Sequence, residues 1–115
     1  MATITYASIE LNQRDKFKIL NGKCESLRKC VGNTYDIVGY AIVNAEDKDG
    51  TPVELYVLIT DQSECIATNS KVCIASFKAM VEAFGEPTDA SPITDVLVVE
   101  GLSKSGRTYL DLTLA

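Results

Sequence analysis

Histidine is absent from the sequence, and its absence removes several kinds of chemistry. Without an imidazole the chain has no Ser-His or Cys-His pair to activate a nucleophile, and no histidine ligand for a metal ion. The cysteines include no C-x-x-C pair, a spacing that zinc sites commonly use. We therefore expect no zinc site. The cysteines are Cys24, Cys30, Cys65 and Cys73.

Long apolar runs are missing as well. No stretch approaches the roughly 20 apolar residues that a membrane-spanning helix needs. Residues 1–18 have neither a charged start followed by an apolar block nor a small-residue cleavage site. We therefore expect a cytoplasmic protein without membrane contact. In that setting the cysteines are expected to be reduced, partly buried thiols.

The length bounds the number of domains. A chain of 115 residues that is 46% hydrophobic can build one core but is short for two. We predict a single domain over residues 1–115. Residues 1–33 are expected to add an N-terminal strand and short helix to a β-rich unit over residues 34–115.

The charge is unevenly distributed. A net charge of −5 argues against indiscriminate binding of duplex DNA through a basic surface. However, residues 14–29 hold six of the 11 basic residues and only two acidic ones. This segment is either a solvated face or an interaction surface.

The clearest structural pattern is a β-hairpin over residues 34–60. Two runs rich in Val, Ile and Tyr flank the polar residues 46–50, which end in Gly50, a residue free to adopt positive φ. Gly39 lies inside the first run, where a residue without Cβ permits a bulge or sharp bend. A first strand that bends favours a small closed sheet over a flat one.

The N-terminal third gives weaker patterns. Residues 3–11 alternate loosely and predict an edge strand. Apolar residues at 20, 24, 27 and 31 follow helical spacing and predict a short helix that starts at Leu20 or at Lys23. Gly32 follows where a helix C-terminus often has a glycine.

The C-terminal half predicts a strand over 64–68, a helix capped by Asn69 or Ser70, and a hairpin with strands over 94–101 and 108–114. Gly85 and Pro87 should end that helix. Apolar strand positions and the apolar stripe of the helix give the predicted core: Ile37, Val57, Ile59, Ile66, Phe77, Met80, Val81, Val98, Leu110 and Leu112.

Three strands, a helix and two strands is the order of an OB-fold. We therefore predict a mainly β fold with helices: an OB-like five-stranded barrel, with a helix between strands 3 and 4 and an N-terminal strand/helix extension. Other small barrels and a ferredoxin-like α+β sheet remain open, because one sequence does not determine strand pairing.

The sequence carries no assembled catalytic motif. An EF-hand register that places Gly50 at loop position 6 puts Ala45 and Tyr56 where the essential carboxylates belong. Acidic residues such as Asp47 and Asp49 lie in a turn, where aspartate is favoured for backbone reasons. We expect a non-enzymatic protein with no catalytic residues, no metal and no cofactor.

Three tyrosines share the polar side of their strands by alternation, and we expect them to face outward. Exposed rings bordered by basic turns are typical of single-strand binding, because bases stack on the rings while cations follow the phosphates. Packing of these rings on neighbouring side chains is the competing interpretation. The predicted binding residues are Tyr40, Tyr56, Tyr109, Lys48, Lys104 and Arg107.

The segments VGYAIV, ATNSKVCIASFKAMVEAFGEPT and VVEGLSKSGRTYLDLTL resemble small single-stranded DNA-binding proteins of tailed phages and prophages of Gram-positive bacteria. The shared motifs are a T-x-S helix cap, an F-G-x-P-T loop and a K-x-G-R hairpin, and the resemblance covers residues 34–114. It implies an OB-type barrel that coats replication or recombination intermediates in the host cytoplasm with little sequence preference. It also implies DNA contacts at Lys104, Arg107 and Tyr109.

Other functions remain open. The main alternative is an acidic phage-type interaction module that docks on a replication or host protein through residues 14–29 or the outer sheet, without binding nucleic acid. A carbohydrate- or small-ligand-binding barrel comes third, and a hydrolase last. Replication proteins are possible further partners, and monomer and homodimer are both open, as is the choice between DNA and RNA.

Overall fold

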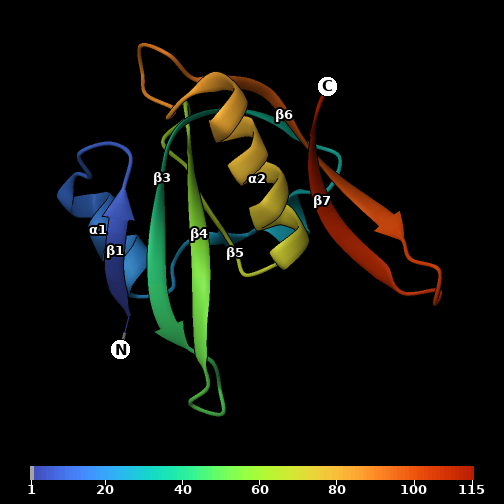
Figure 1. Cartoon of the computed structure of the whole chain (residues 1–115). Coiled ribbons are helices and arrows are strands. Elements are labelled where there is room, and N and C mark those ends of the chain that lie inside the picture. The colour runs from blue at the N-terminus through green and yellow to red at the C-terminus, as the bar shows by residue number, and fades with distance from the viewer. Residues whose placement is uncertain (1) are drawn as a thin grey trace.

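The structure, a computed structural model, describes residues 2–115 and consists of one curled half-barrel sheet with two α-helices (Figure 1). Strands contain 44% of the residues and helices contain 23%, so the predicted mainly β class is confirmed. The helices are α1 (Gln13–Leu20), the 3-10 helix η1 (Leu27–Cys30) and α2 (Lys71–Phe84). The strands are β1 (Thr3–Ala7), β2 (Glu25–Ser26), β3 (Thr34–Glu46), β4 (Pro52–Thr60), β5 (Cys65–Thr68), β6 (Ile93–Leu102) and β7 (Thr108–Leu114).

Strand β3 is the strand about which the sheet curls. Its first half pairs with β6 (Tyr35 opposite Val96) and its second half with β1 (Ala41 opposite Ala7), while β4 runs along its other edge. The β3–β4 ladder shifts register between Ile37 and Gly39, so the predicted irregularity at Gly39 is confirmed. A Cβ on Gly39 would lie 2.5 Å from the Ile9 side chain, so a larger residue there would displace Ile9.

Helix α2 forms as predicted from its caps. The Ser70 hydroxyl accepts a hydrogen bond from the Cys73 amide at 3.3 Å, which satisfies one of the unpaired N–H groups of the first turn. Gly85, at φ 89°, ends the helix, and its amide donates to the Val81 carbonyl. Figure 1 shows α2 lying across the sheet, and its apolar stripe, Cys73, Phe77 and Met80, fills the hollow of the curl.

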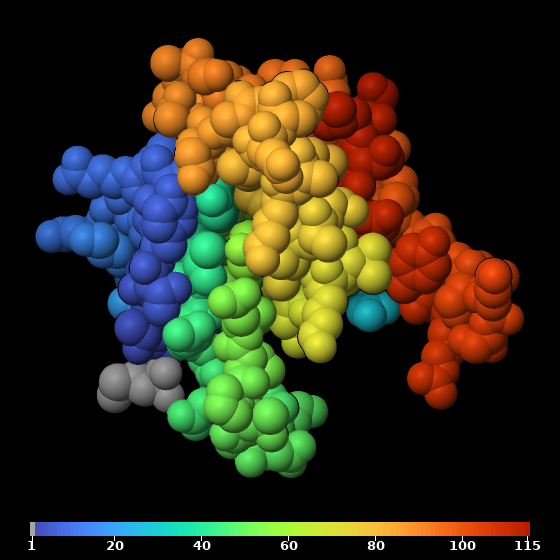
Figure 2. Space-filling model, viewed as in Figure 1, coloured from blue at the N-terminus to red at the C-terminus, as the bar shows by residue number. Residues whose placement is uncertain are grey.

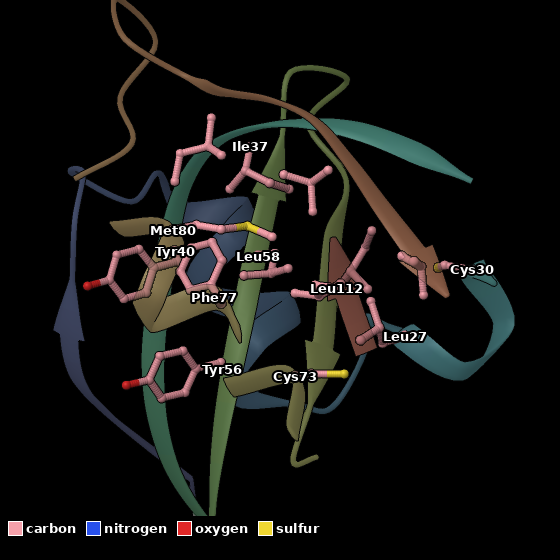
Figure 3. Packing of buried hydrophobic residues seen from close by; sticks show 14 of the residues in the cluster. Leu27, Cys30, Ile37, Tyr40, Tyr56, Leu58, Cys73, Phe77, Met80 and Leu112 are labelled. Carbon is pink, nitrogen blue, oxygen red and sulfur yellow. The ribbon is translucent and has the colours of Figure 1, made fainter. Parts of the chain in front are cut away.

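The sheet is buried on both faces around β4. Tyr56 and Leu58 face α2 and join the larger core, drawn in Figure 3. Val57 and Ile59 face the opposite side, where Leu11 and Ile19 of the N-terminal segment cover them. All predicted core residues are buried except Val81, which is partly buried. The N-terminal segment therefore acts as a second layer over the sheet.

The prediction of a helix that starts at Leu20 or Lys23 is wrong. The helix is α1, which lies earlier and starts where the Asn12 side chain accepts from the Asp15 amide at 2.8 Å. Gly22, at φ 65°, follows its end. The apolar spacing beyond it instead places Leu27 and Cys30 in the short 3-10 helix η1, where both are buried.

A closed five-stranded OB barrel is not confirmed. The sheet order is β2-β5-β4-β3-β6-β7, and within residues 2–115 no ladder joins β7 to β5. The outer edge of β5 takes β2 as a parallel neighbour instead, and α2 packs against β7. The sheet therefore curls without closing, which leaves a seam between β5 and β7.

Candidate functional site

Tyr40 and Tyr56 do not face water, so the expectation that they lie outward is wrong. They are only 7% and 4% exposed. Their rings stack on each other with centroids 5.9 Å apart, and the edge of Phe77 meets the Tyr40 ring at 4.9 Å (Figure 3). Aromatic contacts of this kind stabilise a core. Neither ring is available to stack on a base in this structure.

Both rings are buried because the side of β3 and β4 on which the tyrosines lie faces α2. Each tyrosine buries its ring in the core, and the Tyr40 hydroxyl reaches the rim, where it donates to the Glu86 carboxylate at 3.3 Å. The Tyr6 hydroxyl donates to the same oxygen at 2.7 Å. Burial, with Glu86 next, raises the pKa of Tyr40 above its usual 10.0.

Tyr109 is the one predicted ring that stays accessible, at 40% exposure. It lies opposite Gly101 in the β6–β7 ladder. A Cβ added to Gly101 would overlap the end of the Tyr109 ring, so the ring lies directly against the glycine backbone. Such aromatic-on-glycine pairs are a known device for ordering strand pairs. The ring is therefore held on the hairpin and remains partly exposed.

The basic turn after β6 has the exposed cations Lys104 and Arg107. The Ser103 amide donates to the Arg107 carbonyl at 2.8 Å, and Gly106 adopts φ 82°, which gives a closed, ordered turn. The structure thus places both cations on the same hairpin as Tyr109.

Lys48 lies elsewhere, in the turn between β3 and β4. The Asp47 carboxylate accepts from the amides of Asp49 and Thr51, each at 2.9 Å, so acidic side chains build this turn. Glu46 adds another acidic residue beside it. The environment of Lys48 is therefore acidic, unlike that of the β6–β7 turn.

A hollow of about 520 Å³ lies along the seam, and a second of about 510 Å³ shares Asn69 with it. One extends past Arg28 to Tyr109; the other extends between the start of β4 and α2. Figure 2 shows the surface set back between the projecting β3–β4 and β6–β7 hairpins, with the start of α2 between them. We call the two hollows together the seam groove. The polar and aromatic side chains that line it and that the argument uses are Arg28, Glu54, Asn69, Lys71, Lys78 and Tyr109.

The seam groove is locally basic although the whole chain is acidic. Arg28, Lys71 and Lys78 line it with a single carboxylate, Glu54. Lys71 and Lys78 lie two helical turns apart on one side of α2. Lys78 also places its Nζ 5.8 Å from the centroid of the Tyr56 ring, a cation–π contact.

No carboxylate among residues 2–115 lies within 4.0 Å of the three basic groups; the ion pair that the structure describes joins Lys29 to Glu25. These cations are free to contact an anion. They were missed from the sequence, although the seven-residue spacing of Lys71 and Lys78 outside the apolar stripe of a well-capped helix places them on one exposed face.

The cysteines have core positions, as their hydrophobic surroundings predict. Cys30, Cys65 and Cys73 are buried and Cys24 is partly buried, all as free thiols. Burial raises the pKa of Cys24 and of Cys73, which keeps them protonated at neutral pH. Within residues 2–115 no three potential ligand side chains gather into a metal site.

Comparisons of the chain with protein-family models, with curated proteins and with solved structures find no match. The resemblance to phage single-strand binders therefore stays an expectation drawn from short motifs. In the part of the chain that the structure describes, no helix is long and apolar enough to cross a membrane.

Proposed function

We propose that the protein is a sequence-tolerant single-stranded DNA-binding protein that holds the strand along the seam groove. The observation that carries this proposal is that Arg28 and Tyr109 line one hollow, and Lys71 and Lys78 line the hollow that shares Asn69 with it, in an otherwise acidic chain. Cations that follow the phosphates and a ring for a base are the two components of single-strand sites.

The phosphates have several donors along the groove. The free cations line its walls, and the capped N-terminus of α2, at Ser70, opens into it. Helix N-termini favour anions because their N–H groups and dipole point outward. Lys104 and Arg107 add two exposed cations in the turn of the hairpin that carries Tyr109. Contacts of this kind fix the backbone without selecting a sequence.

The strand arrangement supports the same site. The order β5-β4-β3-β6-β7 is that of an OB-like sheet left open at the seam, and OB-folds receive oligonucleotides between the two corresponding hairpin loops. By this reasoning, and with the phage resemblance, the protein coats replication or recombination intermediates. The proposed DNA contacts keep Tyr109, Lys104 and Arg107 from the sequence-based prediction. They omit the buried Tyr40 and Tyr56 and add Arg28, Lys71 and Lys78.

A salt titration of binding to oligo-dT of about eight nucleotides, a length within the range of single OB sites, tests the proposal. Single strands should bind better than duplex of equal length. Removing one cation that touches a phosphate should lower the slope of log K against log salt by about 0.7, so Lys71→Gln with Lys78→Gln should lower it by about 1.4. Lys16→Gln, outside the groove, is the matched control. No salt-dependent binding by the folded wild type would refute the proposal.

The acidic interaction module remains the second candidate. It is favoured by the net charge of −5 and by the outer edge of β7, which pairs with no strand within residues 2–115. An open strand edge can accept a strand from a partner. A protein that ignores oligonucleotides but binds an extended peptide along β7 would support this candidate.

A further inference from the structure

Helix α1 presents an aromatic ring to solvent on the side of the helix away from the core. Ile19 is 5% exposed and packs under the sheet, whereas Phe17 is 53% exposed. Two residues correspond to about 200° around a helix, so anchoring Ile19 turns Phe17 outward. Because about half of the Phe17 side chain is exposed, its burial contributes little to the stability of the fold.

Basic side chains surround Phe17. An open hollow of about 530 Å³ is lined by Gln13, Arg14, Phe17, Lys18 and Lys23, which we call the α1 face. Arg14 and Lys18 are four residues apart and therefore neighbours on the helix surface. Across residues 2–115 no carboxylate comes within 4.0 Å of the three cations of this face. Among the described residues, the three cations are therefore free to contact an anion beside a partly exposed ring.

The α1 face and the seam groove are lined by consecutive residues of the chain. Lys23, at its edge, is followed directly by Cys24, which lines the groove together with Arg28. The connecting residues are held in place because β2 pairs with β5, Glu25 opposite Ile66. The short connection from Lys23 to Arg28 therefore links the α1 face to the groove.

We propose that a single strand longer than the seam groove continues onto the α1 face, where a base stacks on Phe17 and phosphates contact Arg14, Lys18 and Lys23. This inference rests on the proposed function and extends its site. A polyanion suits the face because cations lie on both sides of one ring. A membrane surface suits it less, because interfacial helices need a wide apolar face and that of α1 is already used by the sheet.

The sequence has no tryptophan, so Phe17→Trp places a single fluorescent reporter on the α1 face. Oligo-dT of about 30 nucleotides, longer than one OB site, should quench its emission, whereas about eight nucleotides should bind in the groove without quenching. Phe84→Trp is the matched control, because Phe84 is 57% exposed at the far end of α2 from Ser70. It should not respond to either length.

Affinities test the same point. Phe17→Ala should weaken binding of the long oligonucleotide by about 5- to 150-fold, the effect of losing one stacked base, and leave the short one unchanged. Lys18→Gln should lower the salt slope for the long oligonucleotide by about 0.7. Lys16→Gln is the control on the same helix, because Lys16 lies about 200° around the axis from Arg14 and should change the slope less.

The outcomes separate this inference from the proposed function. If the wild type binds both lengths but the long one neither quenches Phe17→Trp nor binds Phe17→Ala more weakly, the inference is overturned and the groove stands. Equal effects on both lengths also overturn it, as does quenching by anionic vesicles or an acidic peptide without quenching by oligonucleotides. A wild type that binds neither length refutes the proposed function itself. Circular dichroism verifies that each variant is folded, and Phe17→Leu substitutes for any Ala variant that is not.

Discussion

Phe77 is the residue on which the larger core depends most directly. It is 1% exposed and its ring meets both buried tyrosines, with centroids 4.9 Å from Tyr40 and 6.4 Å from Tyr56. Phe77→Ala should lower the free energy of unfolding by about 3 to 5 kcal/mol, because it removes a buried ring and leaves a cavity. Phe84→Ala, at an exposed site of the same helix, should cost less than about 1 kcal/mol. Urea unfolding of both variants provides the comparison, and equal losses would show that the core is wrongly described.

Tyr40 should make stability fall at alkaline pH. Its pKa is raised from 10.0 by burial and by Glu86, so its hydroxyl stays neutral in the folded state at pH values where the unfolded chain ionises. This contribution is fully present below pH 10 and is lost as the pH rises above 10. In Tyr40→Phe the alkaline loss should be shallower, and the missing hydrogen bond to Glu86 should cost about 0.5 to 1.5 kcal/mol at pH 7. Urea titrations between pH 7 and pH 11 measure both effects. An unchanged alkaline slope would contradict the assignment.

Tyr109 and Gly101 should behave as one unit on the β6–β7 hairpin. Tyr109→Ala should weaken binding of short oligo-dT by about 1 to 3 kcal/mol, whereas Tyr109→Phe keeps the ring and should bind like the wild type. Gly101→Ala should displace the flexible outer end of the ring, and so weaken binding while leaving the fold intact. Fluorescence anisotropy with labelled oligo-dT measures all three. If Tyr109→Ala binds oligo-dT as tightly as the wild type, the ring is not part of the binding site.

At the scale of the elements, local chemistry was sufficient to predict the β3–β4 hairpin, helix α2 and the β6–β7 hairpin. Each is bounded by a turn or cap that nearby residues build, such as Ser70 and Gly85 for α2. Helix α1 was missed because its N-terminus depends on one short cap, Asn12, whereas the apolar spacing after Leu20 imitates a helix. That spacing reflects burial of Leu27 and Cys30 against distant strands.

The faces of the sheet could not be predicted from alternation. Alternation shows which residues share a face, but not which face is covered or by what. Tyrosine fits both surroundings, since its ring can be buried while its hydroxyl reaches a partner at the rim, as Tyr40 does with Glu86. The N-terminal segment covers the opposite face through contacts remote in sequence, such as Ile19 with Ile59. The position of Arg28 was missed for a similar reason, because it lines the same hollow as Asn69 and Ser70 only through the pairing of β2 with β5, which are remote in sequence.

For the whole molecule, the distribution of charge matters more than its total. The net charge of −5 opposes general attraction to nucleic acid, whereas the seam groove gathers free cations beside an exposed ring. Under the proposed function, binding of short strands should therefore depend on this groove and weaken steeply with salt. Under the proposed function, the open seam that distinguishes the sheet from a closed barrel would also make room for the DNA strand.

An NMR titration of isotope-labelled protein with oligo-dT of about eight nucleotides tests the central claim most directly, since that length fits one site. Backbone amide shifts should be largest at Asn69, Ser70 and Tyr109, around the groove, with little change at Asp89 and Ala90 in the loop beyond α2. The account is contradicted if these groove amides stay unchanged at saturating oligonucleotide, or if the largest shifts map to the loop beyond α2.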